Sequence, residues 1–148
     1  MVRVVRSTIV SAPIEAVWDV VRDFNGHDRW HPIVVESHIE RGLYSDRVGC
    51  VRNFRLANGT EMREKLLTLS DLEWALSYCL LDTPLPIFNY VAHVRLLPVT
   101  DGHHTFWEWL GRFDAPTGRE TELASMIGND IYQAGFDAVR SQLEASTS

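Results

Sequence analysis

Residues 120–144, ETELASMIGNDIYQAGFDAVRSQLE, decide the fold predicted for this chain. Their apolar members form two adjoining rows at helical spacing, and their polar members lie on the opposite side. The rows are Leu123, Ile127, Ile131, Gly135 and Ala138, and beside them Tyr132, Phe136, Val139 and Leu143. Small residues such as Gly128 thin this face and let another element or a ligand approach closely. The pattern predicts one long helix lying on an apolar surface.

The upstream sequence supplies that surface, because its alternating and β-branched stretches predict seven strands. These are Arg3–Ser11, Val34–Arg41, Gly49–Leu56, Thr60–Leu69, Trp74–Leu81, Asn89–Pro98 and Thr105–Phe113. Short turns such as Asn58-Gly59 make neighbouring strands antiparallel. One or two short helices are expected after the first strand, with Ser11 as the N-cap of the first helix.

One long helix against seven antiparallel strands defines an α+β domain. A sheet of this size tends to curl, and a curled sheet wrapped around a helix encloses a cavity. We expect a single domain over residues 1–148, because the length suits one core.

Composition narrows the class of protein. The formal net charge is −6 and no run of Lys or Arg occurs, so a nucleic-acid partner is not expected. No apolar run reaches the ~18 residues of a membrane span, and no signal peptide is recognisable, so a cytoplasmic location is predicted. Cys50 and Cys79 have no metal-binding spacing and are interpreted as buried free thiols. The sequence is compatible with a monomer or a homodimer.

Charged residues on inward strand faces are the informative feature for function. Alternation places Arg52 and Phe54 on one face of their strand, and Met62 and Glu64 on one face of the next. A charge on an apolar face is costly unless it is paired. Pairing about Asn58-Gly59 would bring Arg52 and Glu64 near each other across the hairpin, diagonally if not directly opposite. Tyr78 and Tyr90 could add hydroxyls. Such a cluster in an apolar pocket could orient a polar ligand.

Several motifs resemble those of a known family. They are Ala12-Pro13 with Val17-Trp18, Trp30-His31-Pro32, Val48-Gly49-Cys50-Val51-Arg52, Glu64-Lys65-Leu66 and Asn89-Tyr90. The chain resembles the helix-grip superfamily of the birch-pollen allergen, START lipid-transfer domains and polyketide cyclases, over nearly its whole length. The resemblance implies a helix-grip fold, in which a seven-stranded curved antiparallel sheet wraps around a long C-terminal helix. It also implies a largely apolar pocket between the two.

The resemblance extends to single residues. Arg52 and Glu64 resemble the pocket arginine and catalytic carboxylate of the onion lachrymatory-factor synthase, and Tyr78 and Tyr90 resemble its two neighbouring tyrosines. Glu64 and Glu108 are similar to acidic pocket positions of plant abscisic-acid receptors. The receptor lysine that binds the hormone carboxylate has no counterpart here, because Val35 stands in its place. A hormone-receptor role is therefore not expected.

Structural alternatives exist for each candidate. Arg52 and Glu64 could form a cross-strand pair without a role in binding, and the tyrosines could be core aromatics. On the last strand, either Phe106, Glu108 and Leu110 or Trp107, Trp109 and Phe113 face inward. His31 is interpreted as a turn residue near the pocket mouth, and His27 has no partner at a metal-ligand spacing. No nucleotide or nucleophile motif occurs, so no cofactor and no metal are expected.

Two functions follow from this reading. The first is binding of a small hydrophobic molecule, lipid-like or polyketide-like, in the cavity. The alternative is a cofactor-free polyketide cyclase, dehydratase or isomerase in which Glu64 is the general acid–base and Arg52 and the tyrosines orient the substrate. The candidate catalytic residues are Glu64 and Arg52. The candidate ligand-binding residues are Tyr78, Tyr90, Phe54, Met62, Glu108, Trp30, Ile131 and Gly135.

Overall fold

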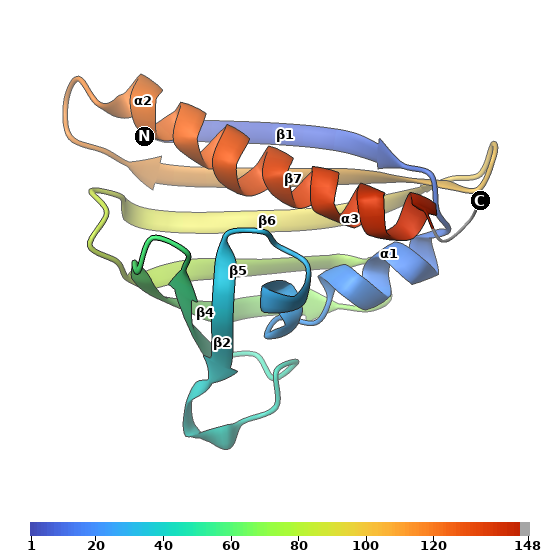
Figure 1. Cartoon of the computed structure of the whole chain (residues 1–148), viewed down its shortest axis with the longest axis horizontal. Coiled ribbons are helices and arrows are strands. Elements are labelled where there is room, and N and C mark those ends of the chain that lie inside the picture. Colours follow the sequence, from blue (N-terminus) through green and yellow to red (C-terminus); the bar gives the residue numbers. More distant parts are fainter. Residues whose placement is uncertain (146–148) are drawn as a thin grey trace.

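The computed structural model describes residues 1–145 as a curved sheet with a long helix across its concave face (Figure 1). The strands are β1 (Val2–Val10), β2 (Val34–Ile39), β3 (Val51–Leu56), β4 (Glu61–Ser70), β5 (Ala75–Asp82), β6 (Phe88–Val99) and β7 (His104–Asp114). The helical elements are α1 (Ile14–Val21), η1 (Gly26–Arg29), η2 (Glu40–Gly42), α2 (Glu120–Met126), η3 (Ile127–Gln133) and α3 (Ala134–Ala145). The predicted α+β helix-grip fold is confirmed. The predicted domain runs to Ser148, and its last three residues lie outside the described range.

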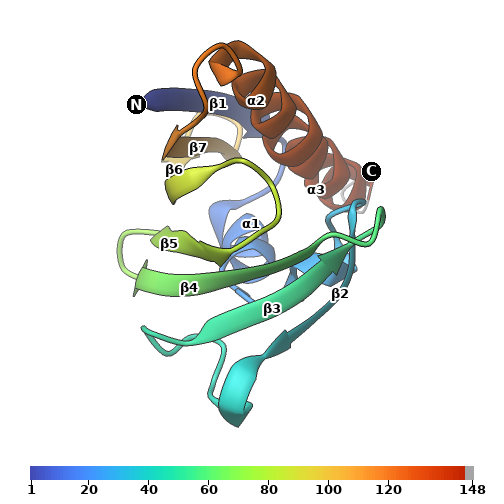
Figure 2. The same cartoon turned by 90° about the vertical axis from the view of Figure 1, so that its left-hand side faces the viewer.

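All seven strands form one sheet in the order β1-β7-β6-β5-β4-β3-β2, with every pair antiparallel. The register shifts between β4 and β5 on either side of Glu64 and Leu66, and again between β2 and β3. Such bulges increase local twist and bend a strand. Figure 2 shows the result: β3 and β2 turn across the concave side and face the helix.

The C-terminal helix contains one feature that its sequence pattern did not predict. Residues 120–145 run continuously through α2, η3 and α3, but η3 is a π-helical segment. Burial therefore passes from Ile127 to Tyr132 in a step of five residues, and then continues through Phe136 and Val139. The wider turn moves the buried stripe from one predicted apolar row to the other, and leaves Ile131 partly exposed.

The predicted cap of the first helix is wrong. Pro13 holds the N-cap position of α1 with an extended backbone, and no side chain caps the helix. The Ser11 backbone N–H instead donates to Glu144 Oε2 over 2.8 Å, which ties the end of β1 to the end of α3. Proline can take this position because its fixed φ already suits the start of a helix.

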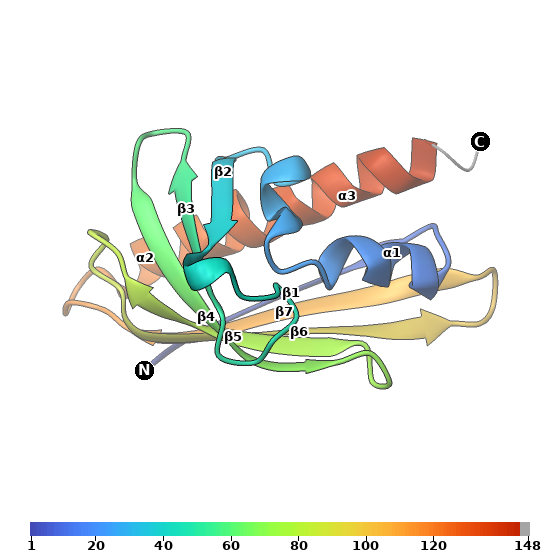
Figure 3. The same ribbon diagram turned by 90° about the horizontal axis from the view of Figure 1, so that it is seen from below.

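The segment between α1 and β2 closes one side of the sheet. Val17, Trp18 and Phe24 bury their side chains in the core that the sheet shares with α3. Ser37 Oγ donates to Asn25 Oδ1 over 2.7 Å, which holds η1 against β2. Figure 3 shows α1 and η1 lying beside the long helix on the same face of the sheet. Within residues 1–145, no helix has the length and apolar character needed to cross a membrane.

Candidate functional site

A cavity that is partly open to solvent lies between the concave sheet, the C-terminal helix and the segment between α1 and β2. It offers about 70 Å³ to the centres of water-sized molecules, and its lining is mostly apolar. Eight of the predicted site residues line it. They are Arg52, Glu64, Tyr78, Tyr90, Phe54, Met62, Trp30 and Ile131. Strand alternation therefore placed the inward faces of β3, β4, β5 and β6 correctly.

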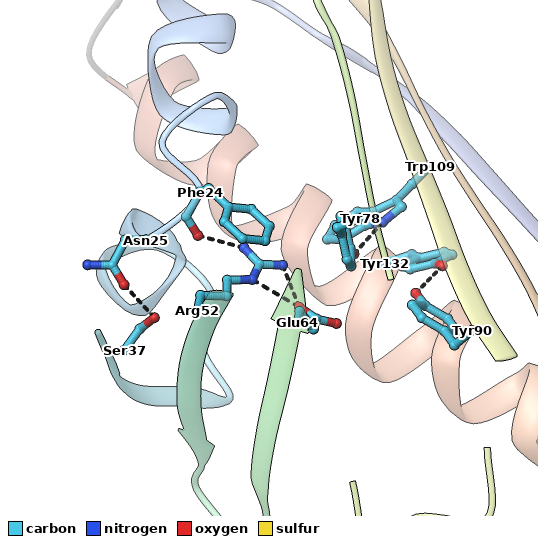
Figure 4. Close-up of polar contacts among 9 residues, drawn as sticks. All are labelled: Phe24, Asn25, Ser37, Arg52, Glu64, Tyr78, Tyr90, Trp109 and Tyr132. Carbon is cyan, nitrogen blue, oxygen red and sulfur yellow. Dashed lines mark hydrogen bonds and ion pairs between the residues drawn. The ribbon is translucent and has the colours of Figure 1, made fainter. Parts of the chain in front are cut away.

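A buried ion pair crosses from β3 to β4. Arg52 and Glu64 are direct partners in the strand register, and their side chains are 9% and 7% exposed. A two-residue Asn58-Gly59 turn would have set them diagonally, but the loop spans residues 57–59, since the Leu56 N–H donates to the Thr60 carbonyl. Arg52 Nε and Nη2 donate to Glu64 Oε1 over 2.9 and 2.6 Å. Arg52 Nη1 donates to the Phe24 carbonyl over 2.7 Å (Figure 4). The pair is thus hydrogen-bonded as well as charge-balanced, which a buried pair requires.

Aromatic rings surround the guanidinium of Arg52. Its Cζ lies 4.0 Å from the centroid of the Phe24 ring and 4.8 Å from that of Tyr78. The Phe54 ring is 5.5 Å away. Ring faces attract a cation and exclude water from it, so the arginine is held in one position.

One carboxylate oxygen of Glu64 is available to a ligand. Both hydrogen bonds from Arg52 end on Oε1, and Oε2 has no hydrogen-bond partner within residues 1–145. Figure 4 shows Oε2 pointing away from the guanidinium. Burial raises the pKa of the Glu64 carboxyl, and Arg52 lowers this pKa by a smaller amount. A carboxylate with a raised pKa is a stronger base than an ordinary glutamate and can return the proton that it accepts.

Three tyrosine hydroxyls and one indole N–H form two hydrogen bonds on the side of the cavity away from Arg52 (Figure 4). Trp109 Nε1 donates to Tyr78 Oη over 3.1 Å, and the hydroxyls of Tyr90 and Tyr132 are hydrogen-bonded to each other. Burial is the main cause that raises the pKa of all three phenols, so they remain protonated at neutral pH. Protonated phenols can donate hydrogen bonds to a ligand oxygen.

Tyr132 was missed as a polar group because its position belongs to an apolar row. The π-helical segment turns it toward β7, where Gly111 leaves room for its ring and hydroxyl. A Cβ atom at Gly111 would collide with the Tyr132 hydroxyl. The glycine in the last strand is the one sequence signal that could have indicated this close approach.

Two histidines between α1 and β2 also line the cavity, His27 in η1 and His31 just after it. His31 Nε2 donates to the Ile131 carbonyl over 2.7 Å, and its Nδ1 accepts from the Ile33 N–H over 3.3 Å. Burial lowers the pKa of His31, so it is a neutral group that ties the residues before β2 to the π-helical segment. His27 differs, because neither of its ring nitrogens has a partner within residues 1–145. The sequence pattern did not assign either residue to the cavity.

The structure settles the orientation of the last strand and corrects one predicted site residue. Trp107 and Trp109 face the cavity, and their rings are stacked with centroids 5.9 Å apart. Glu108 lies on the outer face, where it accepts a hydrogen bond from Arg95 Nε over 3.1 Å. The physical reason is that burying two indole rings stabilises the fold, whereas burying a carboxylate without a paired cation is costly.

Gly135 was predicted to line the cavity, and this prediction is wrong. It lies where the long helix packs on three rings, because an added Cβ would be 3.1–3.2 Å from Trp109, His31 and Trp30. Its small size allows close packing instead of ligand contact. The thiols are free, with Cys50 buried as expected and Cys79 only partly buried. Within the described range, no three His, Cys, Asp or Glu side chains are placed to hold a metal ion.

Comparison with known proteins identifies the family. Residues 1–144 match the profile of the family described as polyketide cyclase / dehydrase and lipid transport. The chain therefore belongs to this family. A comparison with curated proteins found no match.

Solved structures share the fold over nearly the whole chain. The protein XoxI from Bacillus cereus has a TM-score of 0.89 at 23% identity, covering 100% of this chain and 99% of its own. A Thermobifida fusca protein has a TM-score of 0.85 at 32% identity, with 97% and 93% covered. The Zhui aromatase/cyclase from Streptomyces sp. R1128 has a TM-score of 0.82 at 15% identity, with 99% and 95% covered. At 15% and 23% identity, the likeness describes the fold alone.

Proposed function

We propose that this protein binds a small, largely apolar molecule in the cavity beneath its C-terminal helix. The observation that supports this most directly is the free oxygen of Glu64, a buried carboxylate in a cavity with a mostly apolar lining. Membership of a family described by polyketide cyclisation and lipid transport agrees with it. A cytoplasmic location and a monomeric or homodimeric state remain predictions from the sequence.

The volume of the cavity limits the size of the ligand that it can hold. A volume of about 70 Å³ for water centres corresponds to roughly five to seven water molecules, or roughly 150–200 Å³ of liquid. This space suits a molecule with one or two rings. A long acyl chain would require the helix and sheet to separate, so we favour a compact polyketide-like ligand over a long-chain lipid.

A binding test can use thermal unfolding with a set of one- and two-ring ketones and phenols. A ligand at 100 times its Kd should raise the Tm by roughly 5–10 °C. Val94→Phe, which fills the cavity from β6, should abolish the shift. His93→Phe, on the exposed face of the same strand, should preserve it. If no compound shifts the Tm, or if both variants respond like the wild type, the cavity is not the binding site.

Proton-transfer catalysis is the second candidate, and the raised pKa of Glu64 favours it. Its carboxylate would remove a proton from the carbon between two carbonyls, and the resulting enolate carbon would attack a third carbonyl to close a ring. Tyr78 would donate a hydrogen bond to the new alkoxide oxygen, and Glu64 would return its proton to that oxygen to give the alcohol. For the loss of water, Glu64 would remove the second proton of the former enolate carbon as the C–OH bond breaks, and would give this proton to the departing hydroxide. No cofactor enters this sequence of steps.

Glu64→Gln separates the two candidates, because the amide keeps the shape of the carboxyl but cannot accept the proton. With a short linear poly-β-ketone as substrate, we expect binding to persist and cyclisation to fall by at least about 100-fold. Unchanged cyclisation in this variant would exclude the carboxylate from the mechanism. If the wild-type protein binds the ketone but does not cyclise it, only the binding function stands.

A further inference from the structure

Several polar atoms in the cavity wall have no partner in the protein. Both ring nitrogens of His27 and the indole nitrogens of Trp30 and Trp107 are buried without a hydrogen bond within residues 1–145. All three residues line the cavity. A buried polar group without a partner costs stability, so each such group calls for an explanation.

His27 is the least satisfied of these groups. It is 6% exposed, and its ring meets Phe54 edge-on with centroids 4.6 Å apart. Burial lowers the pKa of His27 well below its usual range, and the nearby charge of Arg52 adds to the effect. The imidazole is therefore neutral at pH 7, with one nitrogen that donates and one that accepts. Such a ring can bind a hydroxyl in either direction.

The charges that line the cavity limit the charge that a ligand can carry. Arg52 and Glu64 are its charged liners, and they are paired with each other. His31 is neutral and is bonded at both nitrogens. A carboxylate ligand would meet Glu64 with no unpaired cation to offset it, and an ammonium ligand would meet Arg52 in the same way. The cavity is thus built for an uncharged molecule.

The unpartnered donors indicate where oxygen atoms would lie. Indole nitrogens only donate, so Trp30 and Trp107 require acceptors. Their rings meet edge-on with centroids 6.1 Å apart, and Trp107 also stacks on Trp109. Flat rings of this kind pack well against a flat ligand.

We propose that His27 binds an oxygen atom of the ligand, and that the cavity selects an uncharged, oxygenated ring compound over the carboxylate of the same skeleton. This inference rests on the proposed binding function. It names the class of ligand and the residue that recognises its oxygen.

Three probes with one ring system test the inference: naphthalene, 2-naphthol and 2-naphthoate, titrated at pH 7 and followed by tryptophan fluorescence. The wild type should bind 2-naphthol about tenfold more tightly than naphthalene, the value of one good hydrogen bond. It should bind 2-naphthoate more weakly than 2-naphthol. His27→Phe should bind naphthalene as the wild type does and lose the preference for 2-naphthol. His93→Phe, with the same change on the outer face, should keep that preference.

The outcomes distinguish this inference from the function on which it rests. If neither naphthalene nor 2-naphthol binds, the proposed binding function fails and the inference falls with it. If they bind, but 2-naphthoate binds as tightly or His27→Phe keeps the preference, only the inference is overturned. Nitrogen-15 spectra of wild-type His27 give a second readout that needs no variant. One ring nitrogen should shift with 2-naphthol and not with naphthalene, and an unchanged ring would contradict the proposal.

Discussion

The buried pair of Arg52 and Glu64 makes the strongest prediction about stability. The perturbation is a double-mutant cycle of Arg52→Met, Glu64→Leu and both together. Breaking a buried pair by removing one partner costs about 3–5 kcal/mol, whereas replacing both partners by apolar residues is often neutral. With side chains 9% and 7% exposed, this pair belongs to the buried class.

The structure indicates where each variant falls in that range. After Glu64→Leu, Arg52 keeps its bond to the Phe24 carbonyl and the ring contact at 4.0 Å, so we expect the lower value, about 3 kcal/mol. After Arg52→Met, the carboxylate is unpaired and the Phe24 carbonyl loses its donor, so we expect about 5 kcal/mol at pH 8. The double variant loses only that donor and should lie within about 2 kcal/mol of the wild type.

The cost of Arg52→Met should depend on pH. Without the arginine, burial alone acts on Glu64, and its folded-state pKa rises further above the unfolded value of about 4.3. A carboxyl with a raised folded-state pKa contributes stability at low pH that is lost as the pH rises through that pKa. Arg52→Met should therefore be less destabilising at pH 5 than at pH 8.

Urea unfolding at both pH values measures these effects, and the exposed pair Arg95–Glu108 provides the control. Its side chains are 53% and 26% exposed, so Arg95→Met should cost about 1 kcal/mol or less. The reasoning is refuted if Arg52→Met costs no more than this control. It is equally refuted if the double variant costs the sum of the two single variants.

Three further predictions follow from the packing. His27→Phe should raise the free energy of unfolding by about 1–3 kcal/mol, because an imidazole without partners is replaced by an apolar ring; a lower Tm would contradict this. Gly111→Ala should cost about 1–3 kcal/mol through the clash with the Tyr132 hydroxyl, and Tyr132→Phe should partly restore the Tm of this variant; equal losses with and without that second change would show that the clash is not the cause. Iodoacetamide should modify Cys79 in the folded protein and leave Cys50 unmodified until urea is added, because Cys50 is buried and burial raises its thiol pKa; mass spectrometry that finds both labelled at equal rates would refute this.

Local patterns were enough to predict the sheet, the helix and the proximity of Arg52 to Glu64. Strand alternation has a period of two, so the inward faces of β3 and β4 could be read directly. The Asn58-Gly59 turn predicted that Arg52 and Glu64 lie near each other, and the three-residue loop over residues 57–59 makes them direct partners. Strand ends agree with the sequence prediction within two residues.

Other features depend on contacts between distant segments and could not be read locally. Both faces of β7 carry aromatic residues, so alternation alone could not separate Trp107 from Phe106. The π-helical turn fits Tyr132 against Gly111 on a distant strand, and no local propensity encodes that fit. His27 lies in a short segment without periodicity, and its place in the cavity depends on Phe54 of β3.

One residue of the cavity wall, His27, should lower the stability of the fold and favour binding of the ligand. A core that served packing alone would carry an apolar side chain where His27 stands, and the chain would be more stable with it. Stability and ligand preference should therefore change in opposite directions when His27 is replaced by an apolar residue. His27→Phe is the critical case, because it should gain stability and lose the preference for an oxygenated ring in the same molecule. A variant that gains stability and keeps the preference would show that the imidazole is an unfavourable core residue and not a binding group.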